Sequence, residues 1–212
     1  MPDKNIVVLI SGNGSNLQAF IDQQNTDTLQ GRVVATISNK PDAYGLQRAI
    51  DADIPAITVD HTQFDSREAF DSALMVEIDK FSPDLIILAG FMRILTACFV
   101  THYRGRLLNI HPSLLPKYPG LHTHKRAIVG GDEQHGASVH YVTEELDGGP
   151  LIAQSKIQIQ NNETELSLQK KVQKLEHILY PATANLLLTD KIRLIKDIVY
   201  FEDKPLQKKL YF

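Results

Sequence analysis

The sequence predicts an α/β fold: a single domain with a mostly parallel, twisted sheet, helices on both faces and a Rossmann-like amino-terminal half. Short, almost wholly apolar runs alternate with stretches of helical periodicity over the first two thirds of the chain. Such runs are typical of strands that are buried on both faces of a parallel sheet. The chain has 212 residues, of which 43% are hydrophobic and 22% charged, and this fits one globular domain.

Five apolar runs are the expected parallel strands, and helical spacing fills the gaps between them. The expected strands are Asn5–Ser11, Arg32–Asn39, Pro55–Asp60, Asp84–Phe91 and Leu107–His111. The expected helices are Ser15–Gln24, Asp42–Asp53 and Ser66–Phe81. Strand–helix–strand repeats with short connections indicate right-handed, parallel pairing.

The last third of the chain has a different pattern. Ala137–Thr143 and Leu151–Gln160 are joined by a turn-rich link, which favours an antiparallel pair at the far side of the sheet. Thr164–Thr189 has helical spacing, and we expect a break near Pro181. The tail from Lys191 is charged and β-leaning, and the sequence gives it no place in the fold.

Composition excludes several classes of protein. With 22 Lys and Arg against 25 Asp and Glu, the net charge is −3, so no nucleic-acid partner is expected. The lone Cys98 excludes a disulfide framework and a thiolate metal cage. The longest apolar run, Leu85–Met92, is too short to span a bilayer, and the segment after Asp3 is no signal peptide. We expect a soluble, cytoplasmic protein without a membrane partner.

The first candidate site is the segment SGNGSNLQ, residues 11–18, directly after the first strand. Its glycines allow a sharp turn, and Ser15 or Asn16 can cap a helix whose free N–H groups attract an anion. Leu17 stands where a dinucleotide fingerprint has its third glycine, and no Gly-Lys-Ser/Thr follows. A single phosphate is therefore the expected ligand. An ordinary, well-capped turn is the alternative.

The second candidate site joins a strand end with a distant turn. Asn109 and His111 are two residues apart, so both side chains share one face of a strand that Pro112 ends. Open α/β sheets bind ligands at such carboxyl ends, and an amide beside an imidazole suits an oxyanion. Asp147, followed by Gly148, could orient and charge a histidine. A solvated strand end and a plain Asp-Gly turn are the alternatives.

The remaining histidines carry less information. His122 and His124 form an H-x-H pair without an acidic or thiol partner at ligand spacing, so no metal site is expected. They fit a polar loop or a helix start. The other histidines belong to no recognisable constellation: His61, His102, His135, His140 and His177.

Taken together, the motifs resemble the phosphoribosylglycinamide formyltransferases, folate-dependent enzymes of de novo purine synthesis. The similarity runs from about residue 6 to residue 185. It rests, in order, on SGNGSN at 11–16, SREAFD at 66–71, AGFMRIL at 89–95, NIHPSLLPKYPG at 109–120, LDGGP at 146–150 and EHILYP at 176–181. The resemblance implies the formyltransferase fold and transfer of the formyl group of 10-formyltetrahydrofolate to the amine of 5-phosphoribosylglycinamide, without a metal.

The resemblance also implies a role for each matching residue. Catalysis would fall to Asn109, His111 and Asp147. The ribotide would contact Gly14, Ser15, Asn16, Leu17, Gln18 and Glu176. Folate would be lined by Arg67, Met92, Arg93, Ile94, Leu95, Asn109, Thr143, Glu144, Glu145, Leu146 and Asp147. Residues 1–100 would form a phosphate-binding half, 101–190 a folate-binding and catalytic half, and 191–212 a tail. We expect only small-molecule partners and a monomer or weak homodimer.

Other functions remain as alternatives. Formyltransferases that act on methionyl-tRNA or sugar nucleotides, and formyltetrahydrofolate hydrolases, share the catalytic residues but usually have more chain. A phosphoribosyl-binding module without activity would not need Asn109, His111 and Asp147. A nicotinamide dehydrogenase would need the third glycine and an acidic residue where Ser38, Asn39 and Lys40 stand.

Overall fold

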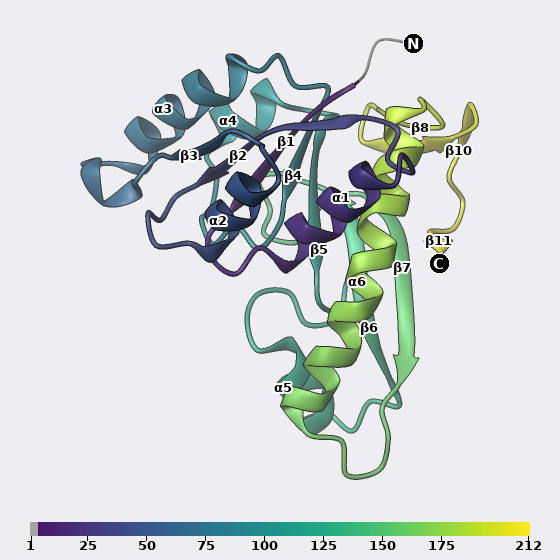
Figure 1. Ribbon diagram of the computed structural model, residues 1–212. Coiled ribbons are helices and arrows are strands. Elements are labelled where there is room, and N and C mark those ends of the chain that lie inside the picture. Colours follow the sequence, from purple (N-terminus) through teal and green to yellow (C-terminus); the bar gives the residue numbers. More distant parts are fainter. Residues whose placement is uncertain (1–3) are drawn as a thin grey trace.

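The computed structural model describes residues 4–212 and contains one mixed sheet of eight strands (Figure 1). Their order is β11-β7-β6-β5-β4-β1-β2-β3. The bounds are β1 Asn5–Ile10, β2 Arg32–Ser38, β3 Ala56–Thr58, β4 Leu85–Leu88, β5 Leu107–His111, β6 Gln134–Tyr141, β7 Leu151–Gln158 and β11 Leu210–Tyr211. Neighbours from β3 to β5 pair parallel, β6 runs antiparallel to β5 and β7, and β11 is parallel to β7.

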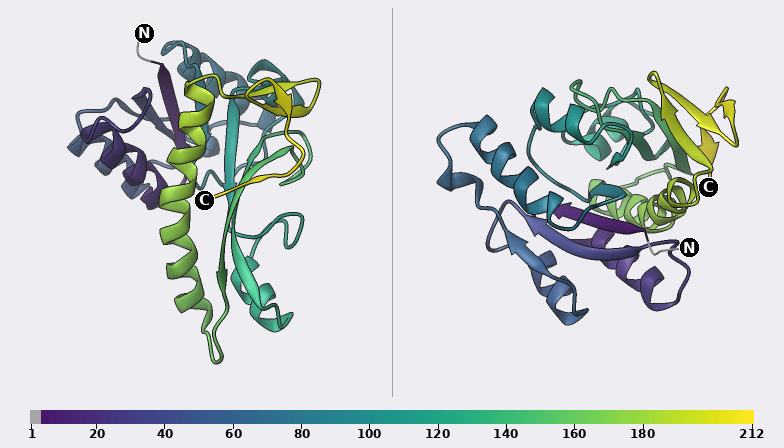
Figure 2. Two further views of the ribbon diagram at one scale, coloured as in Figure 1. Left: turned by 90° about the vertical axis from the view of Figure 1, so that its right-hand side faces the viewer. Right: turned by 90° about the horizontal axis from the view of Figure 1, so that it is seen from above.

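Helices cover both faces of this sheet, as predicted, because the strand residues are apolar on both sides. Val8 of β1 packs into a core with Phe20 and Leu179, and its neighbour Leu9 packs into the opposite core with Phe70. The first core lies under α1, α2 and α6, the second under α3 and α4 (Figure 2). The bounds are α1 Ser15–Asn25, α2 Tyr44–Asp51, α3 Arg67–Asp79, α4 Ala97–His102, α5 Thr123–Val129 and α6 Glu165–Leu188; a 3-10 helix covers His61–Gln63. The predicted single α/β domain is confirmed.

Helix α6 runs through Pro181 without the predicted break. Leu179, Tyr180 and Ala184 are fully buried around the proline. The Tyr180 hydroxyl lies 3.1 Å from the carbonyl oxygen of Leu88 and 2.9 Å from that of Leu108, on the two central strands. This packing against the sheet outweighs the one backbone hydrogen bond that a proline removes.

The tail, which the sequence left without a place, forms two structures. β8 Ile192–Ile195, β9 Ile198–Phe201 and β10 Lys204–Pro205 make a small antiparallel sheet. β11 then adds to the edge of β7 (Figure 1). Within residues 4–212, no helix is long and apolar enough to cross a membrane.

Candidate active site

Asn109 and His111 lie at the carboxyl end of β5, and Asp147 reaches them from the turn between β6 and β7. The Oδ2 atom of Asp147 lies 3.4 Å from Nδ1 of His111, and Oδ1 lies 3.5 Å from Nδ2 of Asn109. The side chains of His111 and Asp147 are each only 7% exposed. Low exposure strengthens the attraction between a carboxylate and an imidazolium. The structure thus brings the three predicted catalytic residues together.

Both ring nitrogens of His111 face oxygen acceptors. Nε2 lies 2.8 Å from the carbonyl oxygen of Tyr118, and Nδ1 faces the carboxylate of Asp147. A neutral imidazole has one N–H and can donate to only one of them, whereas the imidazolium donates to both. An imidazolium at His111 would therefore have an acceptor near each N–H.

His140 is a neighbour of this group that the sequence analysis missed. Its Nδ1 lies 2.8 Å from the carbonyl oxygen of Tyr141 and so carries the proton. Burial lowers the pKa of His140, which keeps the ring neutral. Nε2 is then an acceptor, 3.2 Å from the Nδ2 atom of Asn109 that donates to it. The signal that could have found His140 is the antiparallel register, which sets it directly opposite Asn109.

The predicted ribotide loop precedes α1, although its cap differs from the expectation. Neither Ser15 nor Asn16 caps the helix; the cap position is Gly14, in the left-handed region with φ 74°. The two polar side chains point to α6 instead. Ser15 accepts a hydrogen bond from Gln173 at 2.9 Å, and Asn16 donates to Glu176 at 2.9 Å. The N–H groups of the first helical turn have no partner within a helix, so the loop keeps the features of an anion site.

Glu176 and Asn16 form a polar pair at this loop. Burial raises the pKa of Glu176 to about 6, against the opposing effect of the hydrogen bond from Asn16. The Oδ1 atom of Asn16 is buried and has no hydrogen-bond partner within residues 4–212. A buried acceptor without a donor is costly, which makes it a contact point for a ligand hydroxyl or amine.

Apart from Asn109 and Asp147, described above, the predicted folate residues lie on three segments. Met92, Arg93, Ile94 and Leu95 follow β4, Thr143–Leu146 follow β6, and Arg67 begins α3. Arg93 stacks on Phe70 of α3, with 5.6 Å from its guanidinium carbon to the ring centre. Among the hydrogen bonds and ion pairs of residues 4–212, none connects Arg67 with either of the other segments.

Two further sets of contacts, those of Ser11 and Arg48, were not predicted from the sequence. The Ser11 hydroxyl accepts the N–H of Met92 at 2.7 Å and donates to Asn39 at 2.5 Å, which joins the ribotide loop to the 92–95 segment. Arg48 of α2 donates to Asn13 and Gln18 of the same loop. Ser11 begins the SGNGSN motif, but the motif does not reveal its partners, and no motif marks Arg48. Both sets of contacts depend on how distant segments pack.

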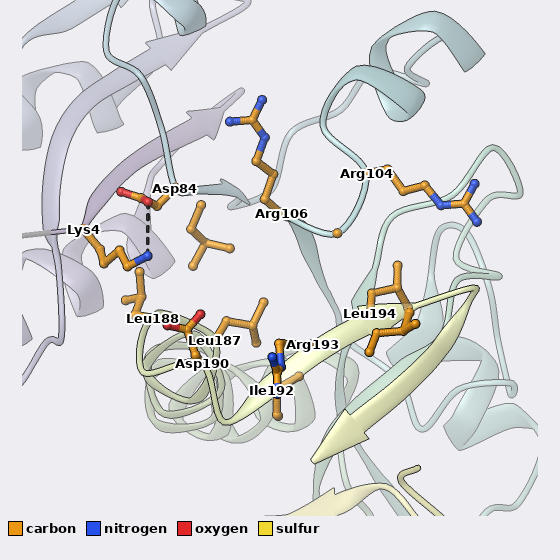
Figure 3. Close-up of a pocket in the computed structure, with 13 residues that line it drawn as sticks. Lys4, Asp84, Arg104, Arg106, Leu187, Leu188, Asp190, Ile192, Arg193 and Leu194 are labelled. Carbon is orange, nitrogen blue, oxygen red and sulfur yellow. Dashed lines mark hydrogen bonds and ion pairs between the residues drawn. The ribbon is translucent and has the colours of Figure 1, made fainter. Parts of the chain in front are cut away.

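A cavity of about 500 Å³ lies at the amino end of β4, whereas the candidate site lies at the carboxyl ends of the parallel strands (Figure 3). Of the charged groups that line it within residues 4–212, all but Asp190 have a hydrogen-bond or ion-pair partner. Lys4 and Asp84 pair at 3.4 Å, and the guanidinium groups of Arg104 and Arg106 point away from Leu187. Arg104 is paired with Asp197, and Arg106 donates to the carbonyl of Pro83. Most of the charge at this cavity is therefore already paired, and the cavity is separate from the candidate site.

Comparison with known proteins decides the family. A sequence profile for formyl transferases matches residues 4–184. Phosphoribosylglycinamide formyltransferase of Escherichia coli strain K12 is 52% identical over 207 residues, which cover 98% of both chains. The chain belongs to the formyl transferase family. This formyl transferase is also similar to the solved phosphoribosylglycinamide formyltransferase of Coxiella burnetii, at 49% identity, TM-score 0.94 and 99% coverage of each chain.

A second solved relative is a glycinamide ribonucleotide transformylase from Symbiobacterium toebii, at 38% identity and TM-score 0.91, covering 94% of each chain. The predicted family, the fold of this formyl transferase and its class as a one-carbon transferase are confirmed. Within residues 4–212, no group of three or more His, Cys, Asp or Glu side chains is arranged to hold a metal ion.

Proposed function

We propose that this formyl transferase moves the formyl group of 10-formyltetrahydrofolate to the amine of 5-phosphoribosylglycinamide, giving 5-phosphoribosyl-N-formylglycinamide and tetrahydrofolate. The observation that carries the proposal is the contact of Asn109 and His111 with Asp147 at the carboxyl end of β5. The loop before α1 follows the carboxyl end of the parallel strand β1 and so lies at the same end of the sheet. The names of the relatives supply the substrate class. In this proposal Gly14, Ser15, Asn16, Leu17, Gln18 and Glu176 hold the ribotide.

The catalytic residues act on the charge that develops at the formyl group. The neutral amine attacks the formyl carbon, a C–N bond forms and negative charge builds on the oxygen. Asn109 and the imidazolium of His111 donate hydrogen bonds to that oxyanion. Because Asp147 holds Nδ1, the N–H at Nε2 is the donor, and the Tyr118 carbonyl marks the acceptor position that the oxyanion would take.

Collapse of the intermediate breaks the bond between the formyl carbon and the folate nitrogen. The proton released by the amine passes to that nitrogen through His111 or ordered water. Arg67 and residues 92–95 and 143–147 would line the folate, with the exposed side chains of Met92, Ile94 and Leu146 offering apolar surface.

A spectroscopic assay with a 10-formyl folate, with and without the ribotide, tests the proposal. Deformylation that requires the ribotide and yields formylated ribotide would support it. Deformylation without the ribotide would identify a hydrolase, and no reaction of the folded protein would favour a binding module.

The proposal also covers the two halves of the chain, its partners, its location and its oligomeric state. We place residues 1–100 in a phosphate-binding half and 101–190 in a folate-binding and catalytic half. The net charge of −3 supports small-molecule partners without nucleic acid or membrane, in the cytoplasm. Light scattering over a range of concentrations tests the proposed monomer or weak homodimer.

A further inference from the structure

Arg48, on α2 and outside every motif above, holds the ribotide loop (residues 11–18) from behind. Its Nε donates to the carbonyl oxygen of Asn13 at 2.9 Å, and Nη2 donates to Oδ1 of the same residue at 3.2 Å. Nη1 donates to Oε1 of Gln18 at 3.0 Å, while the amide of Gln18 donates to Asp22 at 2.9 Å. One rigid guanidinium fork therefore fixes two residues of the loop.

The backbone of α2 approaches the same loop too closely for side chains. The N–H of Gly45 donates to the carbonyl oxygen of Gly12 at 3.0 Å. A Cβ atom on Gly14 would lie 2.7 Å from Cα of Gly45, and one on Gly45 would lie 2.5 Å from Cδ1 of Ile10. Helix α2 and the ribotide loop therefore form one packed unit, so that Arg48 has a fixed position relative to α1.

This contact determines where the loop directs its N–H groups. A trans peptide unit is planar, and its C=O and N–H point in opposite directions. Arg48 draws the Asn13 carbonyl towards α2, so the N–H of Gly14 turns to the opposite side. Arg48 also lines a cavity of about 280 Å³ that extends along α1 from Ser15 to Gln23 and includes His177 of α6.

We propose that Arg48 is a positioning residue for the phosphate group of the ribotide: it orients the loop donors through Asn13 and Gln18 and places a positive charge behind them. This inference rests on the proposed function and names the cation that the ribotide loop itself lacks. It assigns Arg48 a role in binding and none in the chemical step.

Steady-state kinetics of Arg48→Met and Arg48→Lys test the role in binding. In Arg48→Met, the KM for the ribotide should rise about tenfold or more, while kcat and the KM for folate stay within about threefold. Arg48→Lys should recover only part of the loss, because an ammonium group cannot replace the fork. Gln47→Ala, at an exposed neighbour on the same helix, should match the wild type. A ribotide KM within about twofold of wild type in Arg48→Met would overturn the proposal.

Hydrogen exchange of the unliganded protein gives a readout that needs no substrate. Amides of residues 12–17 should exchange about tenfold faster in Arg48→Met than in the wild type, while those of β5 stay unchanged. Thermal melting identifies a variant that has failed to fold, and Arg48→Lys then takes its place. Wild-type exchange at the loop would refute the positioning role, whereas failure of the proposed function would appear in the wild-type assay itself.

Discussion

The Nδ1 atom of His111 lies 3.4 Å from Oδ2 of Asp147, and that oxygen also accepts the backbone N–H of Gly120 at 2.8 Å. One carboxylate thus links the end of β5, the turn after β6 and the loop that follows Pro112. Its charge faces a ring whose other nitrogen is bound to the Tyr118 carbonyl. Removal of either partner would therefore change the charge at the centre of the site.

The first prediction concerns this pair. His111→Ala removes the oxyanion donor and Asp147→Asn removes the charge that favours the imidazolium, so each should lower kcat at least about a hundredfold. Binding of both substrates, measured by calorimetry, should be mostly retained. His102→Ala is the control, because this exposed histidine pairs with Asp79 at 3.0 Å away from the site. Near wild-type turnover in either variant would contradict the catalytic role assigned to His111 and Asp147.

The second prediction concerns Glu176, whose pKa burial raises to about 6. The folded protein binds this proton more tightly than the unfolded chain, so the contribution of Glu176 to stability falls as pH rises from about 4.5 to 6. Glu176→Gln removes the buried charge and should raise the Tm at pH 8 but not at pH 4. The KM for the ribotide at pH 8 should rise, because an acceptor for its hydroxyl groups is lost.

Glu202→Gln, at an exposed position of the tail, is the matched control and should leave both quantities unchanged. A lower Tm for Glu176→Gln than for the wild type at pH 8 would contradict the prediction.

The third prediction concerns His124 and His135, whose rings meet at 3.1 Å between Nδ1 and Nε2. Burial lowers the pKa of His135 to about 4 and also lowers that of His124, although Asp132 and Glu165 act in the opposite direction. Below about pH 6.5, the two histidines bind protons in the unfolded chain but remain neutral in the folded protein. Stability should therefore fall as pH drops from 6.5 towards 4, by about 1.4 kcal/mol per pH unit for one such histidine.

Urea unfolding between pH 4.5 and 7 measures this slope. His135→Gln should flatten it, and His102→Gln should not. Glu176 makes stability fall as pH rises from about 4.5 to 6, which opposes the effect of the histidines. Each variant is therefore compared with the wild type at the same pH. An unchanged slope in His135→Gln would show that the pair does not govern acid unfolding.

The parallel strands could be predicted because each is apolar nearly throughout, and β5 has the expected bounds Leu107–His111. Local sequence pattern does not predict an element whose extent depends on packing against distant residues. Helix α6 continues through Pro181 because buried residues on both sides hold it against the sheet. The short α4 and α5 have too few residues to show helical spacing.

The part of the site that lies on one continuous segment could be predicted from the sequence. Asn109 and His111 follow from strand periodicity and from Pro112, which ends the strand. Asp147 needed the family resemblance, since Asp-Gly by itself indicates only a turn. His140 was missed because its role depends on the register of β6 against β5, which was not assigned from the sequence. Arg48 was missed because its role depends on the packing of α2 against the loop.

The fourth prediction concerns β11, which protects the edge of β7. Ser155 donates to the carbonyl oxygen of Phe212 at 2.8 Å, and Lys156 lies 5.7 Å from the centre of the Tyr211 ring. Deletion of residues 207–212 would free the backbone groups of β7, and an unpaired edge recruits other strands. The Tm should fall by about 2–4 °C for each kcal/mol lost, and light scattering should show stronger self-association with rising concentration. Replacing only Lys208 and Lys209 with alanine keeps β11 and should cause neither change. A truncated protein with the wild-type Tm and mass would mean that β11 contributes nothing to the edge.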